Sequence, residues 1–193
     1  MNHGFIGFGN LAKAIYKGLK NDNNINFAYF AREERNSEAK FINNIEDLVS
    51  ASDVIWLTIK PQDLVGILEQ LQHLDLKDKI FVSPVAGKKT SFIESYLGQH
   101  QPIIRIMPNL AIAYQKSVTS FVSNQPDNAK IQEIFDTLAK LGKAVQLSEE
   151  GFDLFTSIFG SGPAFILSFI QIFKDKMNEL NLPGTLLNEL LLE

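Results

Sequence analysis

The chain has 193 residues, 45% of them hydrophobic and 21% charged, with a formal net charge of −4. This composition excludes a disordered chain, and the length predicts one buried core with a smaller second element. The absence of cysteine excludes a disulfide framework, a thiol nucleophile and a cysteine-based metal site, and three scattered histidines give no metal motif. The acidic balance gives no general attraction to nucleic acid or anionic lipid, so we expect a small-molecule partner.

The first segment with a chemical meaning is Gly4–Ala12, which reads Gly-Phe-Ile-Gly-Phe-Gly-Asn-Leu-Ala. It predicts a short buried strand, a tight turn and a helix over residues 11–19. Gly7 and Gly9 allow the backbone to turn and to approach a diphosphate closely, with Ala12 as the third small residue. The helix would direct its free N–H groups and the positive end of its dipole at that anion. Alone, this pattern is weak evidence for dinucleotide binding.

The next part of the chain alternates between strand and helix patterns. We expect strands over residues 25–31, 41–45, 54–59, 79–85, 103–107, 117–122 and 144–147, and helices over residues 45–51, 63–74, 91–97 and 127–141. From residue 149 the pattern is helical only. The sequence therefore predicts an α/β fold, a Rossmann-type doubly wound and mostly parallel sheet over residues 1–148, followed by a helical region over residues 149–193.

The helical region contains a stretch of 20 residues without a charge, Leu154–Phe173, which is long enough to cross a membrane. Because Gly160–Pro163 interrupts this stretch, we interpret it as two shorter buried helices that meet at a turn, the second beginning near Pro163. Ala164–Phe173 is apolar on nearly all sides, and a chain of this length has little to cover it, so a second subunit is expected to do so. The chain starts directly with strand residues, which leaves no room for a signal peptide and favours a cytoplasmic location.

The end of the second predicted strand indicates which dinucleotide binds. Folds that bind NAD usually carry an acidic residue at this place, whereas this chain has Ala31 and Arg32. Arg32 could pair with a 2′-phosphate, and Arg35 lies close behind it, which favours NADP. The alternative is that Arg32–Arg35 is a solvated charged turn.

Two other strand ends fall on the same predicted side of the sheet, because ligands of open parallel sheets lie beyond the carboxyl ends of the strands. These are Thr58–Gln62 and Ala86–Gly87. Small residues at the second place would again allow a ligand to approach the backbone. Lys60 has an alternative interpretation as a solvated strand end.

Four stretches together resemble pyrroline-5-carboxylate reductase, over essentially the whole chain. They are Gly4–Ala12, Leu57–Gln62, Ile104–Asn109 and Gly160–Phe165. The last two are the specific ones. The resemblance implies an N-terminal Rossmann domain over residues 1–148 that binds NADP, and, over residues 149–193, the start of a helical dimerisation and substrate domain that interlocks with its partner in a homodimer.

The resemblance also implies roles for individual residues. Asn109 would lie near the nicotinamide, and Asn109 and Ser161 are the catalytic candidates. For the turn Gly160–Pro163 two interpretations remain: a helix N-terminus that faces the substrate carboxylate, or a tight corner between buried helices. The cofactor-binding candidates are Ile6, Gly7, Phe8, Gly9, Asn10, Leu11, Ala31, Arg32, Asn44, Thr58, Ile59, Lys60, Pro61, Ala86 and Gly87.

The chain also departs from the family pattern. Leu110 and Ala111 stand where the family commonly has Thr-Pro, and a Ser-Pro-Gly-Gly-Thr segment that binds the substrate carboxylate across the dimer is absent. Either the chain is a fragment of a longer protein, or it has lost the proline-site chemistry. The expected function is NADPH-dependent reduction of 1-pyrroline-5-carboxylate to proline by hydride transfer to the cyclic imine, with no nucleic acid or membrane as partner.

Two other functions fit the same sequence features. One is a non-catalytic NADP-binding or regulatory module related to this family. The other is a reductase of the same fold that acts on a different small substrate, such as a 3-hydroxy acid. The second is disfavoured because those enzymes use a catalytic lysine after the Rossmann domain, and no lysine occurs between Lys143 and Lys174.

Overall fold

The computed structural model describes residues 1–35, 37–180 and 182–192. Eight strands form one sheet in the order β3-β2-β1-β4-β5-β6-β7-β8. Neighbouring strands are parallel, with the exception of β6 and β7, which pair antiparallel. The strands are β1 (Asn2–Ile6), β2 (Asn26–Phe30), β3 (Lys40–Phe41), β4 (Val54–Leu57), β5 (Ile80–Ser83), β6 (Ile103–Met107), β7 (Ser117–Ser123) and β8 (Gly142–Gln146).

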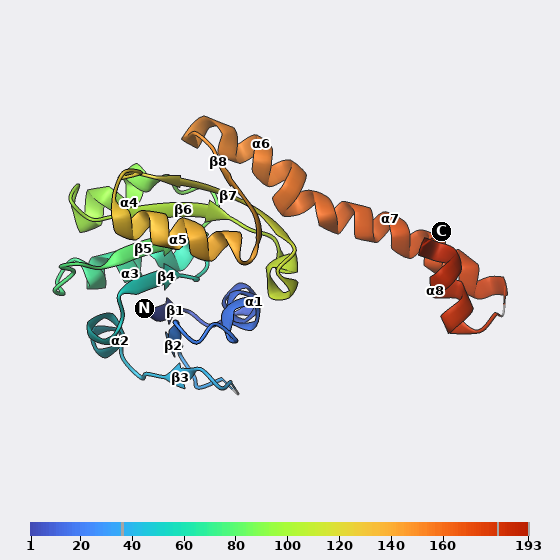
Figure 1. Ribbon diagram of the computed structural model, residues 1–193, viewed down its shortest axis with the longest axis horizontal. Helices are drawn as coiled ribbons and strands as arrows, with labels where there is room; N and C mark the ends of the chain where they lie inside the picture. Colours follow the sequence, from blue (N-terminus) through green and yellow to red (C-terminus); the bar gives the residue numbers. More distant parts are fainter. Residues whose placement is uncertain (36, 181, 193) are drawn as a thin grey trace.

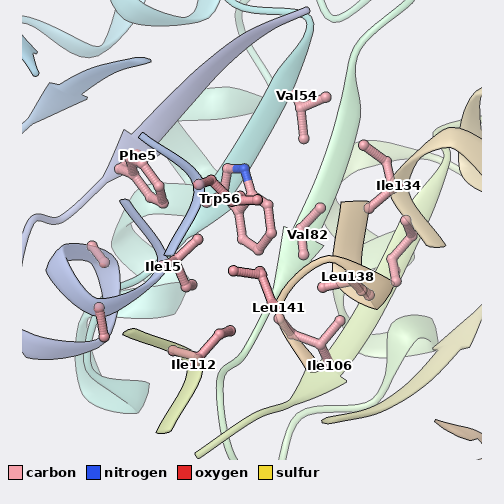
Figure 2. Close-up of a cluster of buried hydrophobic side chains, with 14 of the residues drawn as sticks. Phe5, Ile15, Val54, Trp56, Val82, Ile106, Ile112, Ile134, Leu138 and Leu141 are labelled. Carbon is pink, nitrogen blue, oxygen red and sulfur yellow. The ribbon is translucent and has the colours of Figure 1, made fainter. Parts of the chain in front are cut away.

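Helices cover both faces of this sheet (Figure 1). One face carries α1 (Asn10–Leu19) and α5 (Ala129–Ala139), and the other carries α2 (Ile45–Ala51), α3 (Leu64–Leu71) and α4 (Thr90–Leu97). The central strand β4, Val-Ile-Trp-Leu, is apolar and buried throughout, as expected for a parallel strand with both faces covered. Trp56 on β4 is fully buried, and Figure 2 shows it among side chains from the strands, α1 and α5. The predicted doubly wound, mostly parallel sheet is confirmed.

Two large buried polar side chains, His3 and Arg105, have partners inside this core. His3 on β1 is 1% exposed and its Nδ1 accepts a hydrogen bond from Trp56 Nε1 at 3.2 Å. On β6, Arg105 is 2% exposed, forms an ion pair with Glu149 and lies over the ring of Phe152 at 4.3 Å. Glu149 also accepts from the backbone N–H and hydroxyl of Thr90 at the start of α4. The polar network thus ties the sheet to the start of the helical region.

The helical region differs from the expectation at one point. We expected two buried helices with a corner at Gly160–Pro163, but α6 (Phe152–Phe155), a π-helical segment (Thr156–Ser161) and α7 (Gly162–Met177) follow one another without a break. Pro163 removes a backbone donor, and a widened π-helical turn is one way in which a helix continues past such a residue. There is therefore neither a corner nor a separate helix start at this place.

The helix also leaves the sheet instead of packing on it (Figure 1). Its root is buried, because Phe152 and Phe155 pack against Met107 of β6. In contrast, α7 has no buried residue within the described part of the chain. A last helix, α8 (Gly184–Leu192), follows.

By length and composition alone, the helical stretch Glu149–Leu180 could cross a membrane, and only 6% of its most apolar part is buried. The expected interruption at Gly160–Pro163 was the argument against such a span, and the continuous helix removes that argument. Among the described residues, α7 therefore presents an apolar surface with no buried residue.

Candidate functional site

A cleft with a volume of about 910 Å³ opens at the carboxyl ends of β1, β2 and β4. Since β1 lies between β2 and β4, with the chain crossing to opposite sides, this is the place where doubly wound sheets bind ligands. Ten of the residues expected to bind the cofactor line it: Ile6, Gly7, Phe8, Gly9, Asn10, Ala31, Arg32, Thr58, Ile59 and Lys60.

The turn after β1 depends on glycine at its first position. Gly7 has a φ of +88°, which side chains rarely adopt, and a Cβ on it would lie 2.6 Å from the carbonyl oxygen of Thr58. Thr58 holds the turn from the other side, because its hydroxyl donates to the carbonyl oxygen of Gly7 at 2.6 Å. The two strand ends β1 and β4 are thus locked together at the base of the cleft.

Gly9 provides the open side of the turn. A Cβ built on Gly9 meets no heavy atom within 4 Å among the described residues, so the backbone is accessible from the cleft. Gly9 is also the N-cap of α1; within the described chain no side chain caps this helix start, and no acidic residue lies in its first turn. The free N–H groups and the helix dipole therefore favour a bound anion, and the site fits the diphosphate of a dinucleotide.

The end of β2 places cations beside this anion site. Arg32 and Arg35 both line the cleft. The Arg32 side chain is 88% exposed, and its guanidinium lies 3.5 Å from the carboxylate of Asp63 on the opposite wall. The backbone of Arg35 is fixed by Tyr29, whose hydroxyl accepts from the Arg35 N–H at 2.8 Å and donates to its carbonyl at 2.7 Å. Two cations thus face the cleft where a 2′-phosphate is expected.

Three of the expected cofactor residues near this cleft do not line it: Leu11, Asn44 and Pro61. Asn44 is the N-cap of α2; its side-chain oxygen accepts from the N–H of Asp47 at 2.7 Å, and its amide donates to the Asp47 carboxylate at 2.6 Å. Pro61 begins a short 3₁₀ helix (Pro61–Asp63), and Leu11 lies in the first turn of α1.

The other candidates lie farther along the same sheet edge. Ala86 and Gly87 follow β5, with Gly87 at a φ of +70°, and Asn109 follows β6. From β2 to β6 there are four strand spacings, or about 19 Å. Ser161 is exposed at the end of the π-helical segment, and this segment approaches β6 through a hydrogen bond from Asn109 Nδ2 to the carbonyl oxygen of Phe159 at 3.1 Å.

Several residues of the cleft were not expected from the sequence. Lys13 is the most informative, because it adds a cation one turn after Gly9 on the cleft side of α1. The glycine pattern alone identifies only the small residues, and helical spacing from Gly9 was the signal that could have found Lys13. The remaining unexpected residues are Phe30, Ile45, Asp63, Gly66, Ile67 and Gln70.

Comparisons with known proteins agree with this geometry. Residues 2–87 match the family model described as "NADP oxidoreductase coenzyme F420-dependent". The chain is 32% identical over 182 residues to pyrroline-5-carboxylate reductase of Aquifex aeolicus, with 89% of this chain and 66% of that protein covered. It is 30% identical over 190 residues to the enzyme of that name in Staphylococcus epidermidis, with 92% and 70% covered.

A solved structure shares the fold over all of this chain. The crystal structure of Plasmodium falciparum pyrroline carboxylate reductase with NADP bound superposes with a TM-score of 0.91 at 24% identity and covers 100% of this chain and 74% of that one. The sheet, the glycine turn and the cleft are those of the NAD(P)-dependent oxidoreductases. Within this class, the chain belongs to the pyrroline-5-carboxylate reductase family. It spans 66% and 70% of the length of the two curated relatives.

Proposed function

We propose that the chain binds NADPH in the cleft and takes part in the reduction of 1-pyrroline-5-carboxylate to proline. The observation that carries this proposal is membership of the reductase family over 92% of the chain, together with a cleft that fits a dinucleotide. The Plasmodium falciparum relative has NADP bound, and the cations at the end of β2 support the same cofactor here.

Different residues of the cleft hold different parts of the cofactor. The turn at Gly7–Gly9 and the start of α1 hold the diphosphate, with Lys13 as a nearby cation. Arg32 and Arg35 hold the 2′-phosphate, because a guanidinium matches the geometry of a phosphate group. The nicotinamide end then extends along the sheet edge toward Ala86–Gly87, beyond β5.

When bound, NADPH supplies the hydride for the imine carbon. The nitrogen of a cyclic imine can take up a proton before the reaction, so the protein has little acid–base work to do. Catalysis is then mostly a matter of holding the two reacting carbons about 3 to 3.5 Å apart.

We also propose that residues 1–148 form the NADP-binding domain and that residues 149–193 contribute to a dimer in the cytoplasm. The apolar side chains of α7, such as Phe165 at 73% exposure and Phe169 at 61%, need a cover. A second copy of the chain provides one of matching character, and family membership favours it over a lipid bilayer.

The experiment is a coupled measurement of NADPH binding and turnover. Binding is measured by calorimetric titration of the 193-residue chain, and turnover by loss of NADPH absorbance after the cyclic imine is added. Turnover that depends on the imine supports the proposed reaction. Binding without turnover by this chain and by the full gene product would instead identify a non-catalytic NADP-binding module. No binding would remove the cofactor proposal.

A further inference from the structure

We propose that Asn109 is a positioning residue: it holds the helical region at a fixed angle to the sheet by donating a hydrogen bond to the backbone carbonyl of Phe159, which in an α-helix would accept from the N–H that Pro163 lacks. The inference depends on contacts within the chain and not on the proposed reaction, so the two can fail separately.

Pro163 changes the backbone hydrogen bonding of the helix at this point. In an α-helix the carbonyl of Phe159 would accept from the N–H of residue 163, but Pro163 has no N–H, and its ring presses toward that carbonyl. The turn before it is π-helical, over Thr156–Ser161. Asn109 Nδ2 donates to the Phe159 carbonyl oxygen at 3.1 Å. The side chain of a loop residue 50 positions earlier thus serves a carbonyl that the helix cannot satisfy in the usual way.

Three further hydrogen bonds fix the position of Asn109. Its Oδ1 accepts from the N–H of Ala111 at 3.1 Å, which caps the 3₁₀ helix Leu110–Tyr114. Its backbone N–H donates to the hydroxyl of Ser117 at 3.2 Å, and its carbonyl accepts from the N–H of Ile112 at 3.1 Å. These partners fix which end of the amide is the donor, because Oδ1 must face an N–H and Nδ2 must face a carbonyl. A side chain so constrained can transmit the position of the sheet edge to the helix.

Contacts next to the Asn109–Phe159 hydrogen bond explain how this bond can set the angle between α7 and the sheet. Phe152 and Phe155 anchor the root of the helix on Met107, and a Cβ on Gly160 would lie 3.6 Å from Met107 Cγ. Arg105 and Met107 alternate on β6, so their side chains lie on one side of the strand, and both contact the root of the helix through Phe152. Because α7 has no buried residue of its own in the described chain, its direction is determined at this root.

The test is hydrogen exchange of peptides covering residues 156–163, measured in a double-mutant cycle. Asn109→Asp keeps an oxygen for the Ala111 cap and loses the donor, so protection of these peptides should fall about fivefold, as expected for one lost hydrogen bond. Asn128→Asp is the matched control: Asn128 caps α5 in the same way, through the N–H of Lys130, and has only a local amide contact to Gln125.

Pro163→Ala completes the cycle. It gives the helix an N–H of its own for the Phe159 carbonyl, so Asn109→Asp should change protection less than about twofold in this background. An equal effect of Asn109→Asp in both backgrounds would show that the residue only caps the 3₁₀ helix and would overturn the proposal. So would an effect no larger than that of Asn128→Asp.

A second measurement remains if Asn109→Asp does not fold. In Pro163→Ala alone, the side-chain amide N–H resonances of Asn109 should shift, since their acceptor is taken over by the helix, while those of Asn128 stay in place. Unchanged Asn109 resonances would contradict the proposed link.

Discussion

The sheet region and the helical region contain similar apolar side chains, but these are buried in the first region and exposed in the second. Leu68 on α3 is fully buried, whereas Leu167 on α7 is 64% exposed. The sheet with its two helical layers therefore buries its apolar side chains within the chain, whereas the helical region exposes them, and a second copy would cover them in the proposed dimer. Burial of an apolar side chain contributes in the first case to folding and in the second to association.

The largest expected difference between the regions comes from one substitution made in each. Leu68→Ala should lower the free energy of unfolding by about 2 to 5 kcal/mol, because it leaves a cavity against the sheet. Leu167→Ala should change it by no more than about 0.5 kcal/mol at concentrations where the chain is monomeric, and should weaken self-association. Urea unfolding measures the change in the free energy of unfolding, and light scattering measures the change in self-association. Equal destabilisation by the two changes in the monomer would refute the contrast.

Acid should act on the sheet region through His3. Burial, assisted by the nearby N-terminal ammonium group, lowers the pKa of His3 from 6.5 to about 4. Between these values the unfolded chain binds a proton that the folded chain does not, so stability falls as the pH drops from 6.5 to 4, by roughly 3 kcal/mol. Trp56 is the only tryptophan and reports unfolding of the sheet.

His3→Asn is the control for this pH dependence, since its side-chain oxygen can still accept from Trp56 and does not titrate. Its stability should therefore vary less with pH across the same range. A pH dependence identical to that of the native chain would mean that the carboxylates, and not His3, are responsible.

Exposure in the cleft has a different meaning from exposure on α7, because the expected partner is an anion. Arg32→Ala should raise the dissociation constant for NADPH about tenfold or more, as for a lost charge-assisted hydrogen bond, and leave that for NADH nearly unchanged. Titration with both cofactors checks it. Equal losses for NADPH and NADH would remove the 2′-phosphate role of Arg32.

Periodic patterns predicted the sheet region well and the helical region less well. The strand at Val54–Leu57 and the turn at Gly7 follow from local rules, namely continuous apolarity and small residues before a helix. The partners of these residues do not follow from such rules. Thr58 locks the turn and Asp63 faces Arg32 only because the fold brings β1, β2 and β4 together.

The continuous helix was missed for a related reason. Gly160–Pro163 is a strong local signal for a break, and the sequence shows neither the π-helical turn nor the donor that compensates for it. That donor, Asn109, is 50 residues away from Phe159. The sequence did indicate that one chain of this length has little to cover residues 164–173, and α7 indeed has no buried residue in the described chain.

The central claim is that the turn after β1 holds the diphosphate of NADPH, and Gly9→Asp tests it most directly. The added side chain has room among the described residues, and aspartate is a favourable N-cap, so α1 and the fold should keep or gain stability. Its carboxylate would occupy and repel the anion site. We predict an unchanged or raised melting temperature together with at least about a hundredfold loss of NADPH affinity. A folded Gly9→Asp variant that binds NADPH as well as the native chain would contradict the account.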